Sequence, residues 1–164
     1  MNAGKIFAGV IVISALAVGA AVYYLQVYAY YDKVSYSDDP AMQGATQIRL
    51  TSLATNEPEP ILVEDFQGID ADSSPLRFRA CFTTSQSQAM LTETYVTIEK
   101  PVPLNGPKWF DCYNAQDIGA ALESGEAIAF LGENEIHDGV DRVVAVFPDG
   151  RAFVWHQLND KYEE

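Results

Sequence analysis

The chain has 164 residues, a sequence pI near 4.3 and a formal net charge of −13. All 23 acidic residues and 9 of the 10 basic residues lie from residue 32 onward, so that part carries a net charge of −14. Because no basic residues are clustered, the composition argues against nucleic acid as a partner. It favours cationic partners, such as basic proteins or divalent metals.

An uncharged apolar segment occupies residues 6–25, and its only clearly polar residue is Ser14. As a helix at about 1.5 Å per residue it is roughly 30 Å long, the thickness of a bilayer core. We therefore predict a single-pass N-terminal transmembrane anchor over residues 1–31. A cleaved signal peptide is the alternative, because residues 18–20 resemble a small-x-small cleavage site, but the apolar run continues past that point.

The charges that flank the apolar segment predict its orientation. Lys5 and the α-amino group lie on the N-terminal side, whereas Lys33 on the other side is accompanied by acidic residues. The positive-inside rule then places the N-terminus in the cytoplasm and the domain outside, on the periplasmic side of a bacterial inner membrane. We expect an aromatic belt at the outer interface, formed by Tyr23, Tyr24, Tyr28, Tyr30 and Tyr31.

Small residues recur on one face of the predicted anchor, at Ala8, Val12, Ala15 and Gly19. Small residues four positions apart allow the backbone of another helix to approach closely. Such residues are common in single-pass anchors, but the stripe also fits lateral packing against a partner membrane protein.

We predict a juxtamembrane linker over residues 32–45 and one domain over residues 46–164. Alternating apolar and polar residues predict strands in the first half of this domain, at 48–52, 61–66, 76–83 and 92–99. Prolines and small polar residues predict the loops between them, at 56–60 and 68–75.

One helix is well signalled in the second half. Asn114 is a suitable N-cap, Asp117 lies in the first turn, and Gly125 fits the position after the last turn. A buried strand at 127–131 and a hairpin over 142–157 around a Pro-Asp-Gly turn are expected to follow. Mostly antiparallel strands with one or two helices define an α+β fold.

The chain has only two cysteines, Cys81 and Cys112. In an oxidising compartment such a pair predicts a disulfide, and it would hold residues 109–111 over the Cys81 face of its strand. A redox or copper-handling pair is the alternative, although such thiols usually lie within one turn of each other. A third interpretation is that both thiols are free.

Few other residues offer chemistry, and the common catalytic motifs are absent from the sequence. His156 reads as a hydrogen-bonded strand residue. His137 lies among Glu133, Glu135 and Asp138 in a predicted acidic loop, which could bind a divalent ion or remain a solvated loop. Residues 70–81 start like a calcium loop but lack its glycine and its bidentate glutamate. We predict no enzyme activity, no cofactor and no metal site.

Four blocks of sequence carry a family resemblance, at residues 68–82, 109–112, 149–151 and 155–157. On these blocks the chain resembles an uncharacterised family of small single-pass inner-membrane proteins of alphaproteobacteria, whose members sometimes carry a histidine-kinase label. The resemblance implies no activity. The kinase label does not fit, because the chain lacks nucleotide-binding glycine boxes and its domain is predicted outside the cytoplasm. The resemblance also implies an association with respiratory oxidase genes.

We therefore expect a non-catalytic accessory or assembly protein in the lipid bilayer, beside an integral membrane complex. The resemblance favours a respiratory complex such as cytochrome oxidase. One alternative is a periplasmic metal- or redox-handling factor that uses the cysteine pair, with His137 or His156. Another is a ligand-sensing module with Arg77 and Arg79 as an anion site, although these residues are more often surface ion-pair partners.

Overall fold

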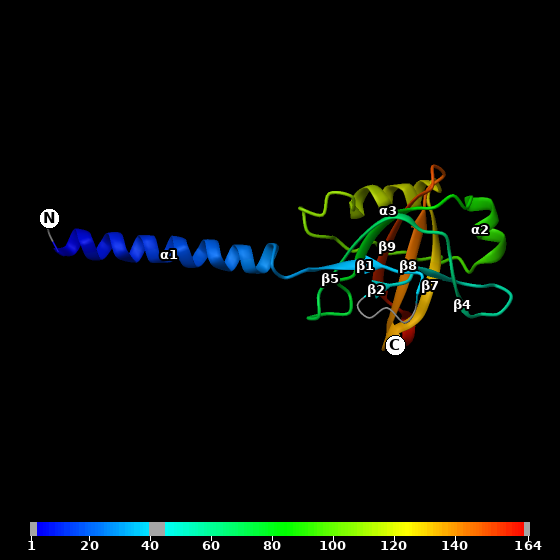
Figure 1. The fold of residues 1–164 in the computed structure, drawn as a ribbon, viewed down its shortest axis with the longest axis horizontal. Helices are drawn as coiled ribbons and strands as arrows, with labels where there is room; N and C mark the ends of the chain where they lie inside the picture. Colours follow the sequence, from blue (N-terminus) through cyan, green and yellow to red (C-terminus); the bar gives the residue numbers. More distant parts are fainter. Residues whose placement is uncertain (1–2, 40–44, 163–164) are drawn as a thin grey trace. The chain divides into compact units, whose positions relative to one another are not determined.

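The computed structural model describes residues 3–39 and 45–162. The chain divides into two compact units, Met1–Asp32 and Lys33–Glu164. The first unit contains α1 (Ala3–Val27), a helix of 25 residues with no buried side chain (Figure 1). By length and composition α1 can cross a membrane, and the apolar core of a signal sequence has the same properties.

The second unit is built on a seven-stranded sheet with the order β2-β1-β5-β6-β9-β8-β7. β1 and β2 pair in parallel, and the pairs from β5 through β7 are antiparallel. The strands are β1 (Asp32–Tyr36), β2 (Ala45–Thr46), β5 (Glu64–Asp70), β6 (Arg79–Thr83), β7 (Ile128–His137), β8 (Val140–Val146) and β9 (Arg151–Leu158).

Among the described residues, a short hairpin and three helical segments complete the unit. The hairpin pairs β3 (Arg49–Thr51) with β4 (Pro58–Pro60), and the helices are α2 (Gln88–Thr94), α3 (Ala115–Ser124) and the 3-10 turn η1 (Asp160–Tyr162). Figure 1 shows β7, β8 and β9 as adjacent strands, and it places α2 and α3 around the sheet. The domain therefore has the predicted α+β fold.

One side of the sheet, the core face, holds the main apolar cluster. Ala80 on β6 pairs with Val154 on β9, which in turn pairs with Val144 on β8. Directly paired residues share one face, so these three side chains lie together. Leu50 of the β3–β4 hairpin and Leu91 of α2 cover them, and both are 0% exposed.

The opposite side, the disulfide face, is also covered. Cys81 pairs with Phe153, and the next residue on this face of β9, Trp155, is 0% exposed. The segment 98–114 crosses this face and leads into α3, whose Ile118 and Ala121 are buried. Because both faces of the central strands are covered, the sheet forms the middle layer of the domain.

The predicted α3 and the predicted hairpin are confirmed. The Asn114 side chain accepts hydrogen bonds from the backbone N–H groups of Gln116 and Asp117, and Gly125 adopts a left-handed φ of 76° after the last turn. The turn between β8 and β9 ends at Gly150, with φ of 87°. A Cβ there would lie 2.5 Å from the carbonyl oxygen of Thr84, so the turn requires glycine.

Several segments differ from the prediction. Within the predicted linker 32–45, residues 32–36 form β1 of the main sheet, and residues 40–44 lie outside the described part. The predicted strand 92–99 begins instead as the end of α2. Thr92 and Thr94 fit this helix because their hydroxyls donate to carbonyls four residues earlier, at 2.7 and 2.8 Å.

The segment 56–70 also differs in its boundaries. Residues 58–60, predicted as a loop, form β4 as one strand of the two-stranded hairpin, where a proline that cannot donate is tolerated. The predicted strand at 61–66 starts only at Glu64 and continues to Asp70, into the predicted loop 68–75. The predicted acidic loop around His137 is the end of β7.

Candidate binding groove beside the disulfide

The two cysteines form the disulfide that the cysteine count predicted. Cys81 lies on β6 and Cys112 lies two residues before the N-cap of α3, with a Cα–Cα distance of 6.3 Å. Neither cysteine is free. The bridge therefore holds the end of the segment 98–114 on the disulfide face, as the sequence analysis expected.

Arg79 fixes the same segment from a neighbouring position. Its guanidinium donates to the carbonyl oxygens of Leu104 at 2.9 Å and Asn105 at 3.0 Å, and to those of Leu76 and Phe78. Arg79 is only 4% exposed. Its donors are thus used for holding the backbone, so the anion site predicted on Arg77 and Arg79 lacks an accessible Arg79.

The segment 98–114, which covers the disulfide face, ends before the edge of the sheet and leaves a groove there. Gln67 and Ile69 of β5 lie on the disulfide face because they pair directly with Cys81 and Arg79. The disulfide face of β5 therefore forms part of the groove floor.

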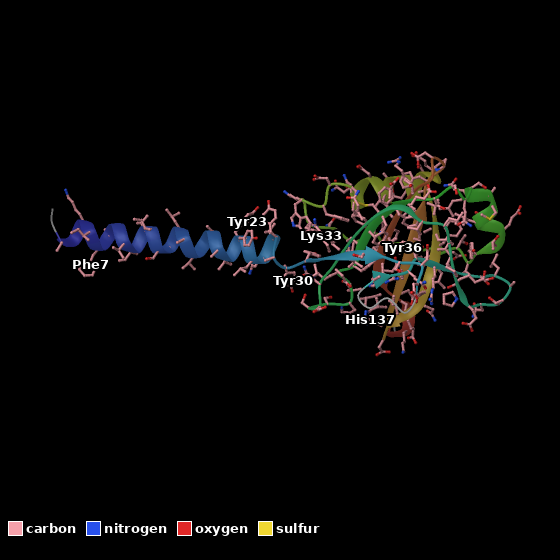
Figure 2. All side chains as sticks on the ribbon, in the orientation of Figure 1. Phe7, Tyr23, Tyr30, Lys33, Tyr36 and His137 are labelled. Atoms are coloured by element: carbon pink, nitrogen blue, oxygen red, sulfur yellow. A yellow bond between two sulfur atoms is a disulfide. The ribbon has the colours of Figure 1, made fainter. Side chains whose placement is uncertain are left out.

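Strand β1 supplies the rest of the floor. Val34 and Tyr36 pack against the core cluster, so the alternation of a strand turns Lys33 and Ser35 to the disulfide face. Figure 2 marks Lys33 and Tyr36 on β1. The groove thus has an ammonium group and a hydroxyl on its floor.

The wall of the groove is the segment that the disulfide holds in place. Phe110 is only 8% exposed, and it lines the groove together with its neighbours Trp109 and Asp111. Trp109 is half-buried and Asp111 is exposed. The groove encloses about 660 Å³, within the usual range of ligand sites.

A second hollow of about 620 Å³ lies on the other side of the same ridge, and Asp111 and Cys112 line both. The second hollow is bordered by α3 and the β8–β9 hairpin. It carries Asp117 and Glu126, and its cation is Arg151, which is paired with Asp149 at 2.6 Å. We call the strip formed by both hollows and the Asp111–Cys112 ridge the ridge surface.

A buried polar cluster lies at one end of the core face. His156, 2% exposed, accepts from Arg142 Nε at 3.1 Å through Nε2, and its Nδ1 lies 2.6 Å from the carbonyl oxygen of Pro75. Burial and the adjacent Arg142 lower the pKa of His156 to about 3. Burial also lowers the pKa of Arg142. Both ring nitrogens of His156 are engaged, so it is a hydrogen-bonded strand residue, as predicted.

The acidic residues near His137 are paired with cations. Glu133 lies 3.4 Å from Arg142, while Glu135 and Asp138 lie 2.7 and 2.5 Å from Lys161. Among residues 3–39 and 45–162 no group of three His, Cys, Asp or Glu side chains could hold a metal ion. The described geometry therefore does not support the hypothesis that this region binds a divalent ion.

The small-residue stripe and the tyrosines remain predictions. Ala8, Val12, Ala15 and Gly19 lie within α1, where the side chains project from the helix without burial (Figure 2). The tyrosines make ring contacts with one another, between Tyr23 and Tyr28, Tyr24 and Tyr28, and Tyr30 and Tyr31.

Sequence reasoning named Trp109, Asp111 and the cysteines but missed the groove. It missed Lys33 as a lining residue because β1 was assigned to a linker. Trp109 and Asp111 lie within three residues of Cys112 in the sequence, but no local pattern marks the hollow beside them.

The architecture defines an α+β domain that follows a candidate membrane helix. Comparison with known families identifies the domain: a family model covers residues 48–164, and the chain belongs to that family, a family of unknown function (DUF6446). No curated protein and no solved structure matches the chain.

Proposed function

We propose that this protein is a non-catalytic accessory or assembly protein, anchored by α1 in a bacterial inner membrane with its domain in the periplasm. The observation that carries the proposal is α1 itself. All of its side chains stay unburied, and only residues 28–31 separate it from the first strand of the domain. Such a helix needs lipid or another membrane helix to cover it.

The disulfide and the charges of the chain are consistent with this placement. Structural disulfides persist in oxidising compartments, and the periplasm is one. The partner is an integral membrane complex that packs against the stripe of Ala8, Val12, Ala15 and Gly19. The resemblance described above favours a respiratory complex such as cytochrome oxidase, and the proposal extends to that partner.

Affinity purification from native membranes in a mild detergent tests the proposal. The wild-type chain is expected to bring down a defined membrane complex. Ala15→Leu with Gly19→Leu places bulk on the stripe and is expected to reduce recovery of that complex by about tenfold, since close backbone approach is lost. Ala17→Leu with Ala21→Leu adds nearly the same bulk to the opposite face and is the control. Recovery of the protein alone would contradict the proposal.

The topology has its own test. A periplasm-dependent reporter fused after residue 164 is expected to be active, and a cytosol-dependent reporter is expected to be inactive. The reverse result would contradict the proposed periplasmic location of the domain, and with it the proposed partner.

A ligand-sensing module is a second candidate, and the groove of about 660 Å³ is the observation that favours it. In that case a small molecule would protect the domain against thermal unfolding without any partner complex. Screening by thermal shift separates the two functions.

A further inference from the structure

The ridge surface is shaped before any partner arrives. Two hollows of about 660 and 620 Å³ flank one ridge that the Cys81–Cys112 disulfide ties to the sheet. Arg79 holds the preceding backbone through Leu104 and Asn105. A surface held in this way loses little conformational entropy when something binds to it.

The side chains of the ridge combine an aromatic ring with a carboxylate. Trp109 stands half-buried in the wall of the groove, and Asp111 lies two residues further along the same ridge. A tryptophan face attracts a cation, and a neighbouring carboxylate adds an ion pair to the same group. Arginine uses both interactions because its guanidinium is planar and carries several donors.

The charges of the second hollow and of the domain as a whole point to the same kind of partner. The second hollow carries the carboxylates of Asp117 and Glu126, and its own cation Arg151 is paired with Asp149. The groove adds one cation, Lys33. From residue 32 onward the chain has 23 acidic and 9 basic residues. A partner with basic residues therefore complements the second hollow and the domain as a whole.

We propose that the ridge surface binds an extended segment of a partner protein that carries lysine or arginine residues. One cation stacks on Trp109 beside Asp111, and a second faces Asp117 and Glu126 in the second hollow. This inference rests on the proposed accessory function and specifies where the partner's extramembrane part docks and what charge it carries.

The test uses the full chain in nanodiscs of a zwitterionic lipid and follows its two indole N–H signals by NMR. The probe is a short peptide with two arginines, and its control is the same peptide with citrulline in their place. The Trp109 signal, assigned with Trp109→Phe, is expected to shift saturably with the arginine peptide. Trp155 is 0% exposed and serves as the internal control.

Two variants with the same loss of charge sharpen the result. Asp111→Asn is expected to weaken peptide binding by about twofold to fivefold, the range for an exposed ion pair. Asp160→Asn, which lies outside the ridge surface, is expected to change it by less than about twofold. Raising the salt concentration is expected to weaken binding of the wild-type chain.

Several results would overturn the inference. Equal shifts with the arginine and citrulline peptides would show that binding does not depend on a cation. Trp109 shifts caused by lipid vesicles or by calcium alone would assign the surface to those ligands. A membrane complex captured equally by wild type and Asp111→Asn would leave the accessory function standing without this docking site. Peptide binding without any captured complex would instead remove the accessory function.

Discussion

Removal of the Cys81–Cys112 bridge perturbs both the stability of the domain and the shape of its ridge surface. The bridge closes a loop with a sequence separation of 31 residues. In the chain-entropy treatment, a loop of that length stabilises the folded state by about 3.7 kcal/mol at 25 °C. For a domain of this size that is a large part of the usual stability of 5–15 kcal/mol.

The assay is urea unfolding of the full chain in mild detergent, followed by Trp fluorescence. Oxidised wild type is compared with reduced wild type and with Cys81→Ala/Cys112→Ala. Both bridge-free forms are expected to lose about 3 to 4 kcal/mol. Reduced wild type keeps the sulfur atoms, so agreement between the two forms attributes the loss to the bridge and not to packing.

The same experiment reports on the ridge surface. Without the bridge, Arg79 still holds Leu104 and Asn105, but Trp109 and Asp111 lie beyond that anchor. Trp109 is therefore expected to become more accessible to acrylamide in the folded state, while Trp155 stays protected. A loss of less than about 1 kcal/mol, or an unchanged Trp109, would refute the reasoning that the bridge builds this wall.

Four further changes have expected outcomes in the same unfolding assay. Gly150→Ala is expected to cost about 1 to 3 kcal/mol, because φ is 87° and the new Cβ would meet Thr84. Arg79→Met is expected to cost about 2 to 4 kcal/mol, since four backbone carbonyls lose their donor. Tyr113→Phe is expected to stabilise the domain slightly, because the buried hydroxyl has no hydrogen-bond partner in the described part of the chain. The pKa of His156 falls from 6.5 to about 3 on folding, so the folded state favours the neutral imidazole. The stability that His156 contributes is therefore complete above about pH 6.5 and is lost as the pH falls toward 3. His156→Asn is expected to flatten this dependence of the free energy of unfolding on pH.

The parts of the fold that the sequence predicted well depend on local signals. Asn114 and Gly125 cap α3 with their own side chain and backbone, and the positive φ of Gly150 belongs to the Pro-Asp-Gly turn itself. Two cysteines in a domain predicted outside the cytoplasm leave one intramolecular pairing. Each of these features can be read without knowing what packs against it.

The parts that the sequence did not predict depend on distant partners. Strand β1 has the sequence DKVSY, which is too polar and too short to be recognised as a strand from its pattern. It forms because it can pair with the edge of β5. Arg79 looked like a surface residue until the segment 98–114 covered it. The groove exists only where that cover ends, so no local pattern could have located it.

The two proposed contacts of this protein make different demands on a partner. A helix stripe of small residues recognises shape within lipid, where apolar side chains gain nothing from burial against one another. The ridge surface recognises charge in water, and its acidic side chains discourage association with anionic lipid headgroups. A membrane protein with a small-residue helix face and a basic extramembrane segment would satisfy both. Because such contacts are linked through one chain, each raises the effective concentration of the other, and two weak interactions then suffice for a stable complex.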